Sequence, residues 1–330
     1  MALEANFCRV QLDQPGPGGI DHLLCVRRTR LGKTGQQICV GDRVQIDGID
    51  WPEARGAVAA LEPRSSLLER PAVANCSRVV VAVALEQPQL DPLQLTRFLL
   101  TAERTGVAVE LVLTKADLLR AAEQEAWRER LRGWGYEPLL VSSQQGDGIA
   151  AVRERLTQPG IAVLCGPSGV GKSSLINALV PALALRVSAV SGRLQRGRHT
   201  TRHVELFPLA PGALLADTPG FNRPDLPADP VALGPLFPEI RQRLATGVCR
   251  FKNCLHQDDP GCAVGSDWDR HGLYLSCLEA VQAQAMRERS RGAEAAGLKQ
   301  RGSRREPLLD QRLRQVSRRR LRQNEPDEAE

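Results

Sequence analysis

The chain has 330 residues, enough for two or three domains with separate hydrophobic cores. Its formal net charge of +6 favours an acidic partner such as nucleic acid, and its 4% aromatic content leaves the cores to aliphatic side chains. The most apolar stretch, Val79 to Leu85, is far shorter than the roughly 20 residues of a membrane helix. Five of the nine cysteines are isolated, which predicts reduced thiols. These features exclude a membrane protein and favour a cytoplasmic one.

Residues 1–70 have the pattern of a small β-barrel. Short runs with strand character alternate with turn residues such as Gly41-Asp42 and Asp47-Gly48. Five strands in so short a segment predict an OB-fold. The expected strands are Phe7–Leu12, His22–Val26, Gln37–Val40, Arg43–Ile46 and Ala57–Leu61.

A basic cluster lies on and after the second expected strand. It consists of Arg27, Arg28, Arg30 and Lys33. Such a cluster fits the phosphate-binding face of an RNA-binding domain, and it fits a solvated basic loop equally well. We predict an OB-fold RNA-binding domain over residues 1–70, with both interpretations of the cluster open.

Residues 71–223 alternate between strand and helix patterns, which predicts a parallel sheet with helices on both faces. This segment is expected to be an α/β nucleotide-binding domain. The expected strands are Val79–Leu85, Val109–Leu113, Pro138–Val141, Ile161–Cys165 and Ala213–Ala216, and the expected helices are Asp91–Arg104, Glu123–Arg132, Ala151–Leu156 and one from Ser174 onward.

A complete G-x-x-x-x-G-K-S phosphate loop lies between an expected strand and an expected helix. Its glycines let backbone N–H groups point at phosphate oxygens, and the helix N-terminus adds its dipole. We expect Lys172 to reach the β- and γ-phosphates and the Ser173 hydroxyl to bind Mg²⁺. The predicted phosphate-binding residues are Gly166, Pro167, Ser168, Gly169, Val170, Gly171, Lys172, Ser173 and Ser174.

A D-x-x-G motif, Asp217 to Gly220, begins 45 residues after Lys172 at the end of another apolar strand. From this place Asp217 can hold Mg²⁺ indirectly, and the Gly220 N–H can contact the γ-phosphate. The pattern is weak alone and strong after a phosphate loop. It predicts a nucleotide-dependent switch.

The segment Gly197–Thr201, between the two motifs, is a candidate switch loop. Either Thr200 or Thr201 can supply a hydroxyl to Mg²⁺ and the γ-phosphate, and the sequence does not decide between them. Our prediction for the two magnesium ligands is Ser173 together with Thr201.

Thr114-Lys115-Ala116-Asp117 has the form of a guanine-recognition motif. The Asp117 carboxylate can accept hydrogen bonds from the guanine N1–H and 2-amino group, which adenine does not offer. Lys115 can pack its stem across the base. Thr114 stands where asparagine is usual, which leaves the guanine affinity open.

Ser142 and Ser143, after the next expected strand, are expected to complete the base pocket. The recognition motif ends 49 residues before Gly166, although it normally follows both other motifs. This order predicts a circularly permuted GTPase.

Four residues after the predicted sheet domain have the spacing C-x₄-C-x-H-x₅-C. Three thiolates and an imidazole match a closed, tetrahedral zinc site with a structural role. Cys277 is too distant and falls on the expected helix Leu273–Arg289, where we expect it in the core. A zinc-binding, mainly helical domain is therefore predicted over residues 224–290. The predicted ligands of one zinc ion are Cys249, Cys254, His256 and Cys262.

Residues 291–330 are rich in arginine, most densely between Arg312 and Arg322. Leu313, Val316 and Leu321 are too few for a packed face, which predicts a tail that is disordered or helical only when bound. Because arginine pairs well with phosphate, we expect this tail to contact RNA.

Together these motifs resemble the RsgA family of circularly permuted GTPases. The resemblance covers nearly the whole chain and rests on the recognition motif, the phosphate loop, the switch segment, the D-x-x-G motif and the cysteine cluster, in that order. It implies an N-terminal OB-fold, a central permuted GTPase and a C-terminal zinc-binding domain. It also implies that the small ribosomal subunit stimulates GTP hydrolysis by the protein, and that the protein assists the maturation of that subunit.

Phe221 follows the D-x-x-G motif, where Ras-like enzymes place a glutamine that orients water. Intrinsic hydrolysis is therefore expected to be slow. The resemblance suggests that His199 positions the water instead, and a cap on a mobile loop is its alternative role. The expected catalytic group is His199, Thr200, Thr201 and Gly220.

The leading prediction is a monomeric cytoplasmic GTPase that binds the small ribosomal subunit and its ribosomal RNA, with Mg²⁺ and one Zn²⁺ as cofactors and no membrane contact. One alternative is a GTP-sensing RNA-binding scaffold without significant turnover. Another is a P-loop ATPase in which residues 114–117 match by chance. Equal competition by GTP and ATP would favour the ATPase, and nucleotide-dependent RNA binding without turnover would favour the scaffold.

Overall fold

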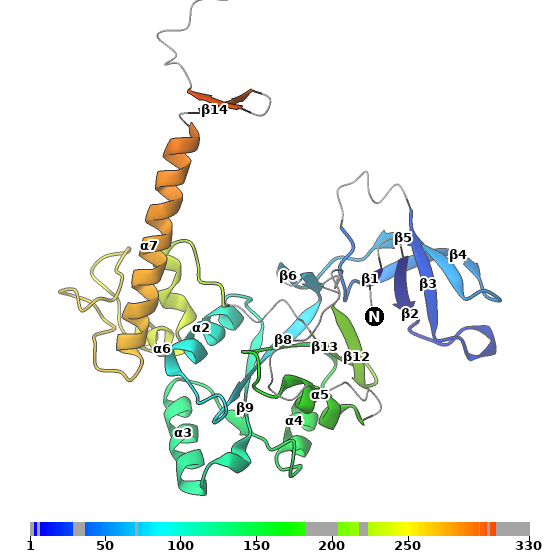
Figure 1. Ribbon diagram of the computed structural model, residues 1–330, viewed down its shortest axis with the longest axis horizontal. Helices are drawn as coiled ribbons and strands as arrows, with labels where there is room; N and C mark the ends of the chain where they lie inside the picture. The colour runs from blue at the N-terminus through cyan, green and yellow to red at the C-terminus, as the bar shows by residue number, and fades with distance from the viewer. Residues whose placement is uncertain are drawn as a thin grey trace, which may run out of the picture.

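The computed structural model describes residues 3–4, 7–28, 37–69, 72–181, 204–217, 224–296, 298–301 and 304–307. Its parts lie in a row: an N-terminal sheet at one end, an α/β domain in the middle, and a C-terminal domain around the long helix α7 at the other end (Figure 1). Among the described residues, no helix combines the length and the apolarity needed to cross a bilayer.

Five strands form the N-terminal sheet in the order β1-β2-β3-β5-β4. Strands β3 and β5 run parallel, and every other neighbouring pair is antiparallel. The side chains that face inward form a small core of Cys8, Leu23, Cys25, Ile38 and Val58. The strand bounds are β1 Leu3–Glu4, β2 Phe7–Gln11, β3 His22–Arg27, β4 Val44–Asp50 and β5 Arg55–Leu61.

The predicted strand at Gln37–Val40 is wrong. Only Val40 pairs, through an isolated bridge with Val73. The Asp42 carboxylate accepts a 2.7 Å hydrogen bond from the Cys39 N–H, and the Asp42 N–H donates to the Cys39 carbonyl at 3.2 Å. These bonds close a turn that occupies the backbone groups a strand would need.

The same turn ties the N-terminal sheet to the α/β domain. Arg64 donates two hydrogen bonds to the Asp42 carboxylate, at 2.6 and 2.8 Å, and the Asn75 amide donates to the Gly41 carbonyl at 2.9 Å. Gly41 has φ +90°, and a Cβ there would lie 2.3 Å from the Ala74 carbonyl oxygen, so the approach requires glycine. The hairpin of β6 (Leu67–Glu69) and β7 (Ala72–Ala74) completes this connection.

The α/β domain is built on a six-stranded sheet in the order β10-β9-β8-β11-β13-β12. Five strands run parallel, as predicted, whereas the edge strand β12 is antiparallel to β13 and was not predicted. Pro208 within β12 weakens the strand pattern, and proline is tolerated there because the strand lies at the edge. The bounds are β8 Cys76–Ala84, β9 Ala108–Thr114, β10 Pro138–Leu140, β11 Gly160–Cys165, β12 Glu205–Ala210 and β13 Ala213–Asp217.

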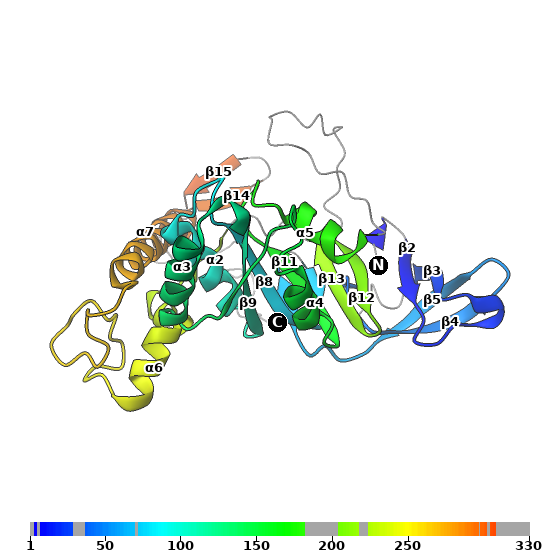
Figure 2. The same cartoon turned by 90° about the horizontal axis from the view of Figure 1, so that it is seen from below.

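Helices cover both faces of this sheet. Alternate residues of β8 enter two separate cores, one with α2 (Pro92–Glu103) and α3 (Ala121–Gly133), the other with α4 (Ile149–Leu156) and α5 (Lys172–Leu179). Figure 2 shows α2 and α3 toward the C-terminal domain, and α4 and α5 beside β11 and β13.

All four predicted helices of this region are present. Helices α4 and α5 begin two residues earlier than predicted, because the glycines before them, Gly148 and Gly171, take left-handed conformations (φ +72° and +92°) that start the helices at once.

The C-terminal domain packs its core against α2. Leu100 of α2 joins Phe237, Ile240, Tyr274 and Leu278 in one buried cluster. The elements are η4 Pro230–Ala232, η5 Gly234–Leu236, α6 Pro238–Thr246, α7 His271–Ala296, β14 Leu298–Arg301 and β15 Arg304–Pro307.

The tail predicted from residue 291 has regular structure in its first part. Helix α7 continues to Ala296, and β14 pairs with β15 in an antiparallel ladder. The core holds the first half of α7, and the segment beyond residue 286 is rich in Ala, Arg and Glu, which extend a helix once it is nucleated. Residues 308–330 of the predicted tail lie outside the described residues.

Candidate functional site

The phosphate loop joins β11 to α5 in a conformation that needs its glycines. Gly166 has φ +139°, and a Cβ on it would lie 1.9 Å from the Ala82 carbonyl oxygen of the neighbouring strand. The Lys172 ammonium donates hydrogen bonds to the Gly166 carbonyl at 2.8 Å and the Pro167 carbonyl at 2.6 Å. Lys172 therefore lies folded over the loop, within reach of a phosphate that the loop would hold.

Among the described residues, the recognition motif, the phosphate loop and Asp217 lie at the carboxyl edge of the parallel strands. Thr114 ends β9 opposite Ala84 of β8, and Asp217 ends β13 opposite Leu164 of β11. Ligands of open α/β sheets bind at this edge. The fold thus brings the guanine-recognition motif beside the phosphate loop, although the sequence places it first.

Thr114 connects the recognition motif to the phosphate loop. Its side chain is 2% exposed, and its hydroxyl lies 3.1 Å from the Val83 carbonyl and 2.5 Å from the Val170 carbonyl. The hydroxyl therefore bonds inside the protein, between β8 and the loop. Threonine can make this link in the place where asparagine was expected.

Lys115 extends across the phosphate loop. Its ammonium donates to the Gly169 carbonyl at 3.0 Å and also to the Gln87 carbonyl. Its Cε lies 4.0 Å from where a Cβ on Gly171 would be. The apolar stem of Lys115 therefore lies over the phosphate loop, where it can pack along a nucleotide base.

The remaining base-pocket candidates lie on adjacent turns. Asp117 is half-buried on η2 (Ala116–Leu118), and the Ala116 N–H donates to the Val141 carbonyl at 3.1 Å. Ser142 is buried, and its hydroxyl accepts a 3.1 Å hydrogen bond from the Gln145 N–H, which closes its own turn. Ser143, the next residue, is half-buried. The structure thus brings the two predicted segments together, next to Thr114 and Lys115, which contact the phosphate loop.

The second candidate site is a cluster of three cysteines and one histidine in the C-terminal domain. One ligand atom from each residue lies within 4.8 Å of all the others. The His256 Nδ1 is 3.7 Å from the Cys249 Sγ and 3.5 Å from the Cys262 Sγ. Ligands at zinc-bond lengths around a tetrahedral centre are about 3.4–3.8 Å apart, so the spacing fits a metal ion. The members are Cys249, Cys254, His256 and Cys262.

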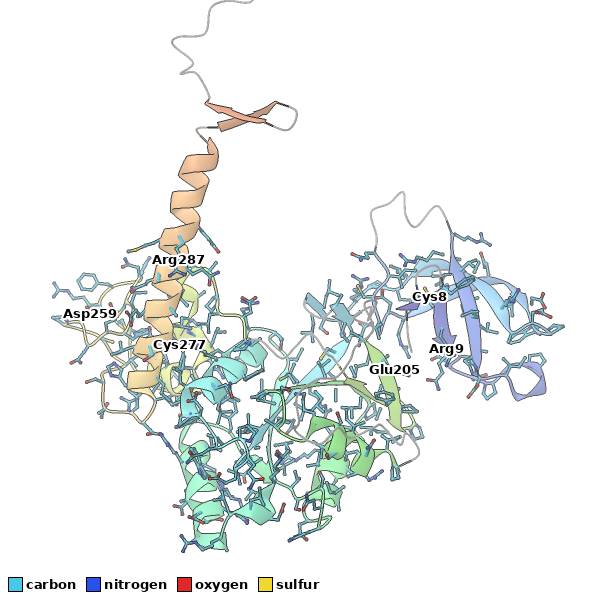
Figure 3. The ribbon with its side chains drawn as sticks, in the orientation of Figure 1. Cys8, Arg9, Glu205, Asp259, Cys277 and Arg287 are labelled. Carbon is cyan, nitrogen blue, oxygen red and sulfur yellow. The ribbon has the colours of Figure 1, made fainter. Side chains whose placement is uncertain are left out.

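The residues around this cluster favour metal binding by the His256 ring and the Cys249 sulfur. Burial holds the pKa of the His256 imidazole below its usual value, which favours the neutral ring with a free lone pair. The Ala263 N–H donates to the Cys249 sulfur at 3.4 Å, a bond that stabilises a thiolate. Asp259 lies on the loop beside the cluster, whereas Cys277 lies on α7, fully buried in the core as predicted (Figure 3).

A family model described as RsgA GTPase matches residues 61–227 of the chain, about half of its length. The chain belongs to the RsgA GTPase family. It is 58% identical to the small ribosomal subunit biogenesis GTPase RsgA of Parasynechococcus marenigrum (strain WH8102), over 84% of this chain and 93% of that protein. As a member of the RsgA family, it is a GTP hydrolase.

Solved structures agree with this membership of the RsgA family. YjeQ from Thermotoga maritima superposes with a TM-score of 0.69 at 27% identity, over 84% of this chain and 95% of that one. YloQ, described as a circularly permuted GTPase, gives a TM-score of 0.67 at 28% identity, over 85% and 92%. The RsgA resemblance drawn from the motif order is confirmed.

Part of the predicted RsgA site cannot be placed. His199, Thr200, Thr201 and Gly220 lie outside the described residues, and of Asp217 only the backbone is described. Two contacts at the candidate sites carried no motif signal. In the nucleotide site it is the hydrogen bond from the Thr114 hydroxyl to the Val170 carbonyl. Beside the Cys/His cluster it is the Tyr274 hydroxyl, which donates to the Leu255 carbonyl next to His256 at 2.5 Å.

Proposed function

We propose that this chain is a small ribosomal subunit biogenesis GTPase, which binds that subunit and hydrolyses GTP when stimulated by it. The observation that carries the proposal is the 58% identity to a protein with that name, over 93% of its length. The assembled phosphate loop and recognition motif support it. The role of the relatives on the ribosome also supports a cytoplasmic location.

Each nucleotide contact has a proposed role. Residues 166–174 hold the phosphates, and Lys172 exchanges its carbonyl partners for the β- and γ-phosphates when GTP enters. Ser173 and Thr201 bind Mg²⁺, with Asp217 behind them. Asp117 accepts from the guanine base, and Ser142 and Ser143 line the pocket beside it.

The proposed chemistry depends on the switch segments. His199 positions the attacking water, and the Gly220 N–H stabilises the γ-phosphate, with Thr200 beside the magnesium ligand Thr201. Phe221 cannot orient water by hydrogen bonding, so we expect fast turnover to require a partner that completes the catalytic site. This is the physical reason to expect stimulation by the ribosomal subunit.

The N-terminal sheet is proposed to be an OB-type module that contacts ribosomal RNA. Its five strands, with β3 parallel to β5, support a partly open five-stranded barrel of this type. On its outer face Phe7 and Val26 pair across β2 and β3 and are 40% and 43% exposed. Arg9 and Arg55 flank this pair and are exposed. An aromatic ring among arginines suits unstacked bases and phosphates.

We propose zinc as the metal of the Cys/His cluster, with a structural role. Cys254→Ser is expected to lose bound zinc and to unfold the C-terminal domain at a lower temperature, because structural zinc binding contributes directly to folding. Zinc content by mass spectrometry and the melting temperature check this. Cys277→Ser, which alters a buried cysteine outside the cluster, should keep one zinc per chain. Full zinc retention by the Cys254 variant would contradict the assignment.

The function is tested by GTP hydrolysis with purified small and large ribosomal subunits added separately. We expect slow intrinsic turnover and stimulation by the small subunit only. Stimulation by the large subunit alone would refute the partner. Nucleotide-dependent subunit binding without turnover would identify a GTP-sensing scaffold, and equal competition of labelled GTP by ATP would identify an ATPase.

A further inference from the structure

A side chain outside the recognition motif holds the turn that carries Asp117. The Gln124 amide nitrogen donates to the Ala116 carbonyl at 2.8 Å and to the Leu119 carbonyl at 3.0 Å. Asp117 lies between these two residues, on η2. Both N–H bonds of one amide are therefore used to span the turn. Because both partners are acceptors, only the nitrogen of the amide can face them.

This turn needs support because its entry is strained. Lys115 has φ +56°, a left-handed conformation that is unfavourable for residues other than glycine. The turn itself closes with only two backbone hydrogen bonds, Leu118 N–H to the Lys115 carbonyl and Leu119 N–H to the Ala116 carbonyl, both at 3.1 Å. The Gln124 amide adds two more from the helix that follows.

The helix that carries Gln124 is anchored at its far end. The Trp134 indole donates to the Asp269 carboxylate at 2.6 Å, and the Arg130 Nε donates to the same carboxylate at 2.7 Å. Trp134 is 1% exposed. Since α3 is fixed between the turn and the C-terminal domain, Gln124 donates from a rigid support.

We propose that Gln124 is a positioning residue for guanine recognition. It holds residues 116–119 so that the Asp117 carboxylate meets the N1–H and 2-amino group of the base. The proposal rests on the proposed role of Asp117. The ligand class it affects is the guanine nucleotide, as distinct from nucleotides whose base lacks the 2-amino group.

The test replaces Gln124 by glutamate, which has the same size but turns a carboxylate toward two carbonyls. Calorimetric titration with Mg²⁺ and GDP or IDP at pH 8 gives both dissociation constants. The GDP constant is expected to rise about tenfold, the effect of losing one well-placed hydrogen bond. The ratio of the IDP to the GDP constant is expected to fall by about threefold or more, because IDP has no 2-amino contact to lose.

Two variants complete the design. Gln242→Glu places the same change on an exposed position of α6 and should leave both constants unchanged. Gln124→Lys keeps a donor that can reach the two carbonyls and should retain the wild-type ratio. An unchanged ratio in Gln124→Glu, or an equal loss of GDP and IDP with a lower melting temperature, would overturn the positioning role.

Failure of the base-recognition role itself would show separately. If Asp117→Asn gains no binding of XDP, Asp117 does not contact the base and the proposal for Gln124 is overturned with it. If that variant does gain XDP binding while Gln124→Glu keeps the wild-type ratio, only the role of Gln124 is rejected.

Discussion

Replacing Arg270 by methionine is expected to lower the free energy of unfolding by about 3–5 kcal/mol, the usual cost of breaking a buried ion pair. Arg270 is fully buried and Glu239 is 7% exposed. The Arg270 guanidinium donates to both carboxylate oxygens, with the Nε bond at 2.7 Å. Methionine would leave the Glu239 carboxylate without its counter-charge in the core. Urea unfolding followed by tryptophan fluorescence measures the loss, since Trp134 lies under the Arg270 guanidinium and Trp268 packs against the neighbouring Phe237.

The loss should come from the unpaired charge rather than from poor packing. The Arg270 guanidinium also stacks over Trp134 at 4.7 Å and over Phe237 at 4.8 Å, measured to the ring centroids, and methionine can fill part of this space. The double variant Arg270→Met/Glu239→Met is therefore expected to recover most of the stability. If the double variant is as unstable as the single one, packing of the guanidinium stabilises the fold more than its charge pairing does.

This ion pair belongs to an extensive contact between the GTPase and C-terminal domains. Immediately after the D-x-x-G segment, the Asp225 N–H donates to the Thr101 hydroxyl at 3.0 Å, and Arg104 pairs with the Asp225 carboxylate at 2.8 Å. The C-terminal domain is therefore tied to α2 by its second described residue. In the permuted order, the proposed γ-phosphate sensor directly precedes the C-terminal domain in the sequence, and the structure shows this domain fixed on α2.

Much of the α/β domain could be predicted because its strands and helices are marked by patterns within their own short stretch of sequence. The strands β8 and β11 are short apolar runs, and the helices begin at recognisable signals such as Asp91, whose carboxylate accepts from the Leu93 N–H. One error arose from a local side-chain hydrogen bond that competes with a strand, and the other from a strand that depends on its neighbour. Residues 37–40 have strand composition but are held in a turn by Asp42, and β12 depends on pairing with β13 at the sheet edge.

The nucleotide site was predictable to the extent that motifs mark it. The phosphate loop and the recognition motif were identified from residue order, and the structure brings them together. The contact that connects them joins two residues distant in sequence, Thr114 and Val170. No periodicity or spacing indicates such pairs, because they are set by strand order in the sheet. The sequence therefore does not reveal that the Thr114 hydroxyl bonds inside the protein.

The second large effect is expected from Asp117→Asn, which should exchange guanine for xanthine preference. Asparagine can still accept from the base N1–H, but its amide N–H would face the guanine 2-amino group, donor against donor. Losing charge-assisted hydrogen bonds of about 1.5–3 kcal/mol each should raise the GDP dissociation constant about 100-fold. Xanthine offers a 2-oxo acceptor in the same position, so XDP binding should rise. Competition titrations with GDP and XDP measure both changes.

The control for this exchange separates base contacts from phosphate contacts. Lys172→Ala removes an ammonium from the phosphate loop and should weaken GDP and XDP alike, leaving their ratio unchanged. Asp117→Asn should change the ratio of the GDP and XDP dissociation constants, because it leaves the contacts to the two phosphates intact. Because the Thr114 hydroxyl bonds inside the protein, to the Val83 and Val170 carbonyls, we expect guanine specificity to depend on the proposed Asp117 contact. If Asp117→Asn weakens GDP and XDP to the same extent, the base is not recognised by this motif.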